Sequence, residues 1–403
     1  MSLKIAVYHN LPSGGGKRAL HEMVKHLTGS HELEVFTTSS ADHDFCDLRP
    51  YIAQYRIYPF KPLMLFRSPF GRVNAALRTL DLFRLDEIQR KIATDIDQQN
   101  YDLVFVHNCR YSQAPGLIRY LHTKSIYYCG EPPRGFTEPH IARPYFKRSS
   151  TRQIVDCIDP LPGYYRRTLL QLDRASTMAA TKVLVNSAYS RESFYRIYGQ
   201  FATTCYLGVD CDKFHPIGLK RQPYVFSVGS LGPKKGFDFL IESLALIPSD
   251  QRPALVLACN EVNPLEKIYL EGLAHRYAVQ LEIQALISDN DMVELYNQAL
   301  LTVYAPVMEP FGFVPIESMS CGTPVIGVNE AGVRETIIDN VTGLLIEREP
   351  DHFAKSILNL LSNPSLASEY GCNGREYVLQ NWTWDKSIEK LEAHLKSVAA
   401  LDN

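Results

Sequence analysis

The sequence lacks a long hydrophobic run: no stretch approaches the ~18 consecutive apolar residues of a membrane-spanning helix. It also lacks a signal-peptide core, because its first residues, MSLKIAVYHN, pass directly into a strand-like segment. The nine cysteines form no CxxC pair and no cysteine–histidine metal spacing. Thiols scattered in this way are typical of a reduced cytoplasmic protein. We therefore expect a cytoplasmic protein without a disulfide framework or a structural zinc site.

The length and charge distribution indicate more than one module. A chain of 403 residues exceeds the ~100–200 residues of an ordinary domain, so two or three domains are expected. The net charge of −2 hides an asymmetry. Residues 1–200 hold 27 Lys or Arg against 18 Asp or Glu, whereas residues 201–403 hold 15 against 26. A basic half joined to an acidic half indicates modules with different partners, and the basic partner can be a nucleic acid, a membrane or an anionic substrate.

Both halves alternate strand-like apolar runs with segments of helical periodicity. The first half begins with a strand at Leu3–Tyr8 and a helix at Lys17–Leu27, and the second begins with a strand at Tyr224–Val228. Strand, helix and strand in succession predict parallel sheets with crossover helices. The predicted fold class is α/β, with two tandem Rossmann-like domains facing a central cleft. The predicted boundaries are residues 1–207, a linker at 208–223, residues 224–382, and a terminal helix at 383–403.

Residues 304–323, YAPVMEPFGFVPIESMSCGT, hold the strongest candidate site. Glu309 lies in a loop after a predicted strand, and Pro315 suits the first turn of a helix that also carries Glu317. Amides around Gly312–Val314 would then leave a helix N-terminus, which binds anions readily. The segment thus offers donors for a phosphate between two carboxylates for hydroxyl groups. The alternative is a helix-terminal carboxylate that complements the dipole, beside a solvated loop glutamate.

Two further segments add to this candidate site. Residues 226–244, FSVGSLGPKKGFDFLIESL, place Gly229 and then Lys234 and Lys235 between a strand and a helix. A glycine there lets backbone approach a ligand, and a lysine can neutralise a diphosphate; the alternative is a solvated basic turn. Residues 329–347, NEAGVRETIIDNVTGLLIE, begin another helix near residues 331–333.

The order of these motifs resembles the retaining nucleotide-sugar glycosyltransferases of family 4, the glycosyl transferases group 1, which have the GT-B fold. The resemblance covers most of the chain. It also includes SGGGKRALHEMVKHL at 13–27, VLVNSAYSRESF at 183–194, YLGVDCDKFHP at 206–216 and SDNDMVELYNQAL at 288–300. The terminal helix, preceded by Trp384, matches the family helix that crosses back onto the first domain.

The resemblance implies a donor site and a catalytic set. Glu309 would orient the hydroxyls of the donor sugar, Glu317 would bind the ribose, and Lys235 would bind the diphosphate. Leu286 and Ile287 would hold the base, while Gly15 and Gly16 would face the diphosphate from the first domain. The remaining donor-binding residues implied are Gly229, Ser230, Lys234, Phe311, Gly312, Phe313 and Val314.

Two departures from the family pattern concern the reacting atoms. Ser230 stands where the family usually has an arginine, and Lys234 could replace that arginine only as a point charge. Gly130 stands where many members carry a histidine beside the reacting carbon. Glu131 and Arg134 follow it directly, and His107 ends the preceding predicted strand. We therefore add Glu131 and His107 to Glu309 and Lys235 as catalytic candidates, although a lone histidine at a strand end is more often a packed residue.

The glycine-rich start also superficially fits a dinucleotide fingerprint through Gly14, Gly16 and Ala19, with Glu34 downstream. Five residues separate the strand from the first glycine, whereas the fingerprint begins directly at the strand end. A nicotinamide enzyme is therefore not expected.

Basic and aromatic residues interleave in two segments of the first half, residues 56–84 and 134–152. Such a composition is typical of an interfacial membrane contact or of a groove for an anionic acceptor. A nucleic-acid groove is not expected, because no recognised nucleic-acid module accompanies the segments. The other alternative is a solvated loop over packed aromatics. The residues assigned to the acceptor or membrane side are Arg67, Arg72, Arg78, Arg134 and Arg143.

Together these features predict a retaining hexosyltransferase that moves a sugar from a UDP-sugar to a hydroxyl acceptor, in polysaccharide or glycolipid synthesis, by same-face attack. The expected partners are the nucleotide-sugar donor, a glycan or lipid-linked acceptor and an anionic membrane on its inner face. No cofactor and no metal is expected, since no DxD-like motif lies near the site. The alternatives are an inactive nucleotide-sugar-binding protein and a sugar-nucleotide epimerase of the same fold.

Overall fold

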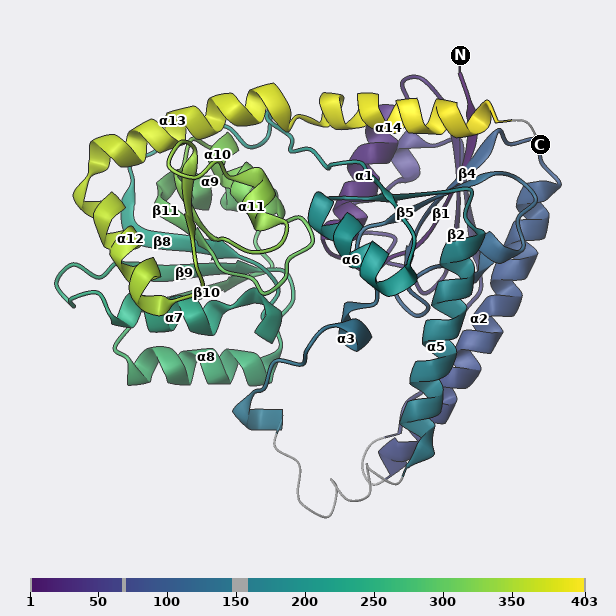
Figure 1. Cartoon of the computed structure of the whole chain (residues 1–403), viewed down its shortest axis with the longest axis horizontal. Helices are drawn as coiled ribbons and strands as arrows, with labels where there is room; N and C mark the ends of the chain where they lie inside the picture. The colour runs from purple at the N-terminus through teal and green to yellow at the C-terminus, as the bar shows by residue number, and fades with distance from the viewer. Residues whose placement is uncertain (1, 67–69, 147–158, 402–403) are drawn as a thin grey trace.

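The computed structural model describes residues 2–66, 70–146 and 159–401. Its first domain is built on a sheet of seven parallel strands in the order β3-β2-β1-β4-β5-β6-β7 (Figure 1). The strands are β1 (Lys4–Asn10), β2 (Glu32–Thr38), β3 (Gln54–Tyr58), β4 (Leu103–Cys109), β5 (Ser125–Cys129), β6 (Lys182–Val185) and β7 (Thr203–Thr204).

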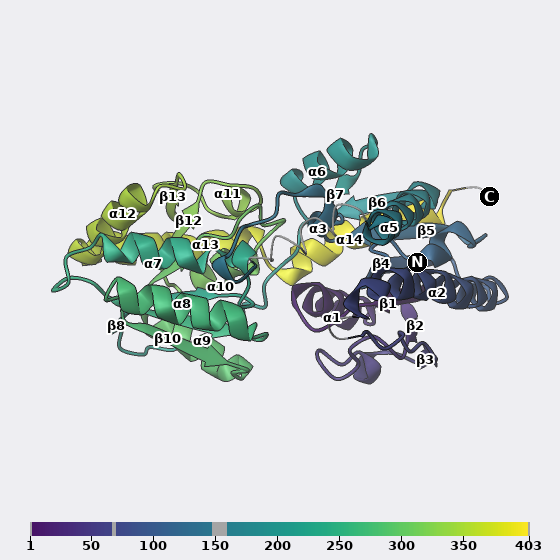
Figure 2. The same ribbon diagram turned by 90° about the horizontal axis from the view of Figure 1, so that it is seen from below.

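The second domain is built on a sheet of six parallel strands in the order β10-β9-β8-β11-β12-β13. They are β8 (Gln222–Val228), β9 (Ala254–Cys259), β10 (Leu281–Ala285), β11 (Ala299–Tyr304), β12 (Val325–Val328) and β13 (Gly343–Ile346). In both sheets the central strands are almost wholly buried, because helices cover both faces. Two parallel-sheet α/β domains side by side, as Figure 2 shows, confirm the predicted fold class.

Helices connect the strands of each sheet. Around the first sheet lie α1 (Gly15–Leu27), α2 (Asn74–Asp97), α5 (Pro160–Ala179) and α6 (Ala188–Tyr198). Around the second lie α7 (Phe237–Ala245), α8 (Pro264–Arg276), α9 (Asp289–Gln298), α10 (Phe313–Ser320), α11 (Val333–Thr336), α12 (Pro350–Ser362) and α13 (Pro364–Asn381). The helix α9 begins with a capping box between Ser288 and Asp291, the local signal that fixes its first residue. No helix of the described residues is long and apolar enough to cross a bilayer.

The last helix, α14 (Trp384–Ala399), leaves the second domain and packs on the first, as the resemblance implies (Figure 1). Its buried face, which includes Trp384, Leu391 and Leu395, joins the core of α1 and β1. The chain passes close to itself at this crossing, because a Cβ on Gly208 would lie 2.6 Å from the Trp384 amide nitrogen. Both passages of the chain between the domains are thus packed together.

The prediction missed β3 and the 24-residue helix α2. The buried face of α2 carries polar residues such as Thr79, Asp81 and Gln89 among its apolar ones, so the sequence shows no clean apolar stripe. Asp81 accepts hydrogen bonds from the Leu63 amide and pairs with Arg78 and Arg84. The helix that packs beside α2, α5, begins at Pro160, with the Asp159 side chain as its cap.

Candidate donor and acceptor site

The candidate site lies where the loops after β8 and β11 face the first domain. The Lys235 side chain crosses Gly229, because a Cβ on that glycine would lie 3.0 Å from the lysine Cδ. Gly236 has a φ of 66°, and a Cβ there would lie 1.9 Å from the Ala305 carbonyl oxygen. These two glycines bring the lysine-bearing turn against the start of the 305–312 loop. The two predicted motifs therefore form one site.

Lys235 and Glu309 form an ion pair within this site. The lysine Nζ donates to the Glu309 Oε2 at 2.9 Å. Burial alone would raise the pKa of Glu309, but the charges of Lys235 and Arg134 outweigh it and hold that pKa below its ordinary value. Glu309 is therefore ionised at neutral pH, and an acceptor of hydrogen bonds only.

Arg134, which the sequence analysis assigns to the acceptor or membrane side, lies in the cleft beside Glu309. It starts the short helix α3 (Arg134–Thr137), which Figure 1 shows between the two domains. Its guanidinium donates to the Val307 carbonyl oxygen (2.9 Å) and to Glu138 (2.7 Å), and lies 3.4 Å from Glu131. Lys234 pairs with Glu138 at 2.7 Å, so in this structure it is held away from the role of the missing family arginine.

The N-terminus of α10 presents backbone amides to the cleft. Its cap residue is Gly312, with a φ of 81° and no capping side chain, so the amides of Phe313 and Val314 receive no side-chain cap. Gly15 of the first domain lies opposite, because a Cβ on it would lie 3.7 Å from the Phe313 ring. The structure thus brings the glycine-rich start against the predicted anion site.

Glu317 lies one turn further into α10 than the sequence predicts, and its side chain is 2% exposed. The Tyr296 hydroxyl donates to its Oε2 at 2.8 Å, and the Arg18 guanidinium pairs with its Oε1. The same guanidinium lies over the Phe313 ring, 4.7 Å from its centroid. Arg18 and Tyr296 were not predicted as site residues. For Arg18 the available signal was its place in the first turn after the glycine run.

The proposed base edge of the site is the loop after β10. Leu286 has a φ of 55° and is 79% exposed, while Ile287 is half-buried. The Leu286 amide donates to the Cys259 carbonyl oxygen at 2.8 Å, which fixes the loop on the neighbouring strand. Ser230 follows β8, which lies on the other side of β9 from β10, and it is half-buried. Phe311 is buried against Phe313 and Trp382, so only its backbone can serve a ligand.

His107 lies inside the first sheet. Its ring stacks on Tyr128 at 5.2 Å and meets the edge of Phe105 at 4.9 Å. Burial, with the charge of Lys17, lowers the pKa of His107 to about 3, so the imidazole is neutral. This packing favours a structural role for His107. Glu131, with half of its side chain exposed, lies closer to the cleft, and the place of a Cβ on Gly130 has no heavy atom within 4 Å.

A buried neutral histidine makes stability depend on pH. The folded pKa of His107 lies below its unfolded value, so the unfolded chain binds more protons between pH 6.5 and about 3. Stability is therefore lost as the pH falls through this window. His107→Phe keeps a ring against Tyr128 but cannot bind the proton. We expect its free energy of unfolding to fall by about 2 kcal/mol less than that of the native chain between pH 7 and pH 5. Denaturant unfolding at both pH values measures this, and equal losses in the two proteins would contradict it.

Arg143 lies on the second domain, which corrects its assignment to the acceptor or membrane side. Its guanidinium pairs with Asp238 at 2.9 Å and Glu266 at 3.1 Å, and lies over the Tyr269 ring. The side chain is almost fully buried, because it ties the segment after α3 to α7 and α8. Arg78 is likewise engaged with buried Asp81, whereas Arg72 is exposed. Arg67 lies outside the described residues.

Comparison with known proteins agrees with this geometry. Residues 212–377 match the family model described as "Glycosyl transferases group 1". The chain is 26% identical over 260 residues to alpha-1,3/1,6-mannosyltransferase ALG2 of Mus musculus, covering 57% of this chain and 62% of that protein. It is 30% identical over 233 residues to the GDP-mannose-dependent alpha-(1-6)-phosphatidylinositol monomannoside mannosyltransferase of Mycobacterium tuberculosis, covering 52% and 60%. The chain thus spans about three fifths of the length of these relatives.

Solved structures resemble the whole chain. Sucrose-phosphate synthase from Thermosynechococcus elongatus superposes with a TM-score of 0.75 at 20% identity, covering 99% of both chains. HepE from Anabaena in complex with UDP-glucose superposes with a TM-score of 0.73 at 17% identity, covering 98% of this chain and all of that one. The chain has the GT-B fold, and its second domain belongs to the group 1 glycosyl transferases. The predicted family resemblance is thereby confirmed.

Proposed function

We propose that this protein is a retaining glycosyltransferase that moves a hexose from a nucleoside-diphosphate sugar to a hydroxyl acceptor. One observation carries the proposal: the Lys235 ammonium pairs with the Glu309 carboxylate, and the uncapped amides at the start of α10 follow Glu309 and precede Glu317 in the chain. A cation and amides suit a diphosphate, and two carboxylates suit the hydroxyls of a sugar and a ribose. The groups of a nucleotide sugar follow in the same order.

Cleavage of the bond from sugar to phosphate builds positive charge on the anomeric carbon and negative charge on the leaving phosphate. Lys235 and the α10 N-terminus stabilise the phosphate, while ionised Glu309 accepts hydrogen bonds from the sugar hydroxyls. The acceptor attacks the face from which the phosphate leaves, and a phosphate oxygen takes the acceptor's proton. Closure of the two domains excludes water that would otherwise hydrolyse the donor. A reaction without a bound metal remains part of the prediction.

Donor binding must exchange two ion pairs of this structure for donor contacts. Lys235 leaves Glu309 for the diphosphate, and Arg18 leaves Glu317 so that the ribose hydroxyls reach the carboxylate. Each cation exchanges a carboxylate for the diphosphate, and each carboxylate exchanges a cation for hydroxyl donors, so neither carboxylate is left without a hydrogen-bond partner. Arg18 would remain beside the diphosphate, since its guanidinium already lies over Phe313.

The proposed donor is a UDP-sugar, in keeping with the prediction and with HepE, which was solved with UDP-glucose. GDP-mannose is the second candidate, because the mycobacterial relative is named for it. Melting temperatures measured with UDP-glucose, UDP-galactose, UDP-N-acetylglucosamine and GDP-mannose test the proposal, since a ligand that binds the folded state raises the melting temperature. We expect one sugar nucleotide to raise it by several degrees more than its free sugar, and no response to any of them would overturn the proposal.

The same incubations distinguish the two alternatives. An inactive binding protein would leave a bound nucleotide sugar unchanged, and an epimerase would convert it without an acceptor. A transferase instead hydrolyses it slowly, releasing the nucleoside diphosphate, and NMR of the products separates these outcomes. The related proteins reported above are named as transferases or synthases, which does not favour either alternative.

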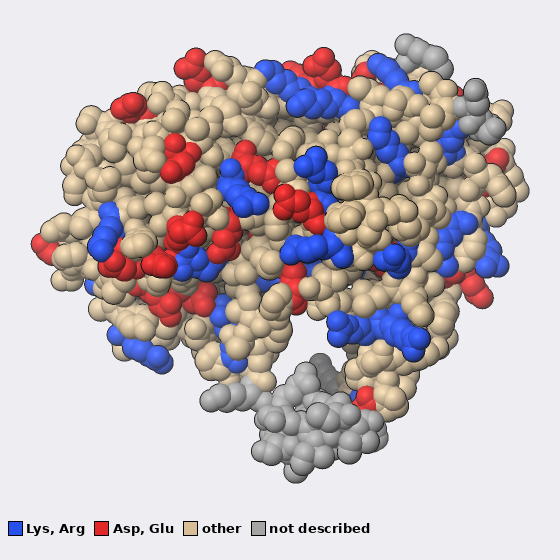
Figure 3. All heavy atoms as spheres, viewed as in Figure 1, with Lys and Arg blue, Asp and Glu red and all other residues tan. Residues whose placement is uncertain are grey.

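We further propose a glycan or lipid-linked acceptor and a peripheral contact with an anionic membrane. The support is an exposed apolar patch, which we call the α2 patch, around the first turns of α2; it comprises Met64, Leu65, Phe66, Val73, Leu80 and Phe83. Exposed Lys61 and Arg72 flank it. Figure 3 shows Lys and Arg side chains over the lower part of the α2–α5 pair. Apolar side chains framed by cations suit an anionic bilayer surface.

Reversing the two exposed charges tests the membrane contact. Each basic residue near an anionic surface contributes about 1 kcal/mol, so Lys61→Glu with Arg72→Glu should weaken binding to phosphatidylserine vesicles at least tenfold. Arg78 is unsuitable for this test, because its reversal would leave Asp81 beside a second buried negative charge. Arg276→Glu, an exposed change on α8, is the matched control. Vesicle sedimentation measures the affinities. Equal affinities of the native protein, the double variant and the control would contradict the proposed contact.

A further inference from the structure

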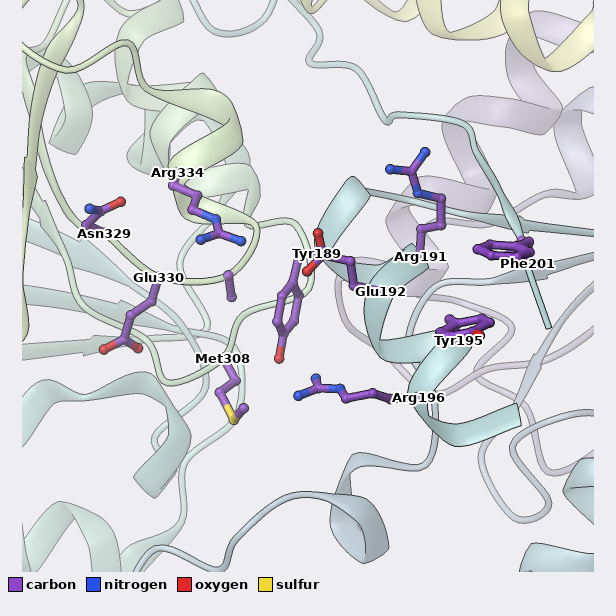
Figure 4. A pocket seen from close by; sticks show the side chains of 12 residues that line it. Tyr189, Arg191, Glu192, Tyr195, Arg196, Phe201, Met308, Asn329, Glu330 and Arg334 are labelled. Carbon is purple, nitrogen blue, oxygen red and sulfur yellow. The ribbon is translucent and has the colours of Figure 1, made fainter. Parts of the chain in front are cut away.

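A cavity of about 1000 Å³ opens between α6 of the first domain and two loops of the second (Figure 4). Its first-domain wall carries Arg191, Arg196 and the Tyr195–Phe201 ring pair. Its second-domain wall carries Met308, at the loop that leads to Glu309, and Arg334 of α11. The cavity is separate from the donor contacts described above, but its wall continues directly into the Glu309 loop.

The cavity wall is cationic. Figure 4 shows Arg196 and Arg334 extending toward the space between the domains. Within the described part of the chain, Arg191, Arg196 and Arg334 form no ion pair, and the only side-chain hydrogen bond among the three runs from Arg196 to Ser193. Of the two carboxylates in the wall, Glu330 is neutralised by Arg348 through contacts of 2.7 and 2.8 Å. The remaining Glu192 cannot balance three guanidinium groups, so the cavity suits an anion.

The wall also offers an apolar face and an unused polar atom. The Tyr195 and Phe201 rings stack at 4.7 Å and 19°, and Phe201 is 82% exposed. A face of this kind accepts a sugar ring or another flat group of a ligand. The Tyr189 hydroxyl is buried in the same wall and has no hydrogen-bond partner among the described residues. A buried hydroxyl without a partner is costly, and a ligand would supply one.

The backbone around the cavity is strained and fixed between the domains. Met308 and Ala331 line it with φ values of 51° and 49°, a conformation that costs a non-glycine residue about 1–3 kcal/mol. The Ser187 hydroxyl donates to the Pro310 carbonyl oxygen at 2.5 Å, and Glu335 accepts from the Ala188 amide at 2.8 Å. These contacts hold α6 against the loop that carries Glu309. The two walls are therefore positioned relative to the sugar site.

We propose that this cavity binds the acceptor, and that the acceptor carries a phosphate or carboxylate group held by Arg196 and Arg334. A ring of the acceptor lies on the Tyr195–Phe201 face, and its reactive hydroxyl extends past Met308 toward the donor sugar. The acceptor assignment rests on the proposed function, whereas the anion site does not. The protein therefore selects its acceptor by charge as well as by shape.

Binding of mannose 6-phosphate, with mannose as the uncharged match, tests the anion site by calorimetry. Saturating nucleoside diphosphate is present, so that the donor site is blocked. We expect measurable binding of the phosphate only, weakened at least tenfold by Arg196→Glu with Arg334→Glu and unchanged by Arg276→Glu. A second arm uses vesicles that contain phosphatidic acid. If the native protein binds these vesicles but not the sugar phosphate, and the double variant loses vesicle binding, the anion is a lipid headgroup. This result would also support the site.

The proposal is overturned if the double variant binds both probes as the native protein does, or if the native protein binds neither. Nucleoside-diphosphate binding by the double variant shows that it is folded, and it must equal that of the native protein. This readout also separates the two proposals. If the proposed donor site is wrong, neither the native protein nor any variant binds the nucleotide there. If only the proposed anion site is wrong, nucleotide binding stays intact.

Discussion

Replacing Glu309 by alanine should lower transfer by about 10²–10³-fold, the usual effect of removing one charge-stabilising contact from a transition state. The carboxylate is half-buried, ionised and paired with Lys235, so it is placed to hold sugar hydroxyls and to offset charge on the anomeric carbon. The loss should appear in kcat, because the contact strengthens as charge develops. Steady-state kinetics with the preferred donor measure it.

Glu309→Gln is the matched control for this change, because it keeps the shape and one acceptor oxygen but removes the charge. Both variants should bind the nucleoside diphosphate at least as tightly as the native protein, since Lys235 is released from its ion pair. Turnover unchanged in Glu309→Ala would contradict the assignment of the sugar site. Loss of nucleotide binding in both variants would show that Glu309 acts on the fold of the loop instead.

Replacing Lys235 by alanine should weaken nucleotide binding and lower transfer by about 10²-fold or more, because the leaving diphosphate loses its cation. The neighbouring Lys234 is an internal control. It carries the same charge one residue away, but its ammonium pairs with Glu138 rather than with the site. Lys234→Ala should therefore change transfer by less than about fivefold, the scale of a surface ion pair.

The comparison of the two lysine variants is decisive for the departure at Ser230. If Lys234→Ala proves as damaging as Lys235→Ala, Lys234 leaves Glu138 on donor binding and does replace the family arginine. If neither variant affects nucleotide binding, the diphosphate is not bound at this turn. Isothermal titration of the nucleoside diphosphate with each variant separates these results.

The elements with local signals could be predicted from the sequence. The capping box at Ser288 marks the first residue of α9, and the apolar face of the last helix, including Leu391, packs on the first domain as expected. Lys235 and Glu309 meet because the neighbouring parallel strands β8 and β11 end at one edge of the sheet. Two glycines, Gly229 and Gly236, then bring the loops into contact.

The contacts between the domains could not be predicted. Arg18 and Glu317 are 299 residues apart, and Arg143 and Glu266 are 123 apart, so no local pattern relates them. The helix α2 was missed for a different reason, since its buried face holds paired polar groups such as Asp81. Periodicity detects apolar faces, and polar groups that are satisfied inside the fold weaken that signal.

These contacts change the meaning of the basic and acidic halves. Arg18 and Arg143 of the basic half pair with carboxylates of the acidic half, and Arg134 lies beside Glu309. Part of the charge asymmetry therefore joins the two domains of one molecule. Some of the cations that remain exposed flank the α2 patch or line the cavity beside α6, where a lipid surface and an anionic acceptor are proposed to bind.

The most direct test of the proposed donor site is the structure of the protein with its preferred nucleotide sugar. We expect ribose hydroxyls on Glu317 with Arg18 displaced, the diphosphate on Lys235 and the α10 amides, and the sugar on Glu309. A nucleotide bound elsewhere, or bound here with the Arg18–Glu317 and Lys235–Glu309 pairs both intact, would contradict this assignment.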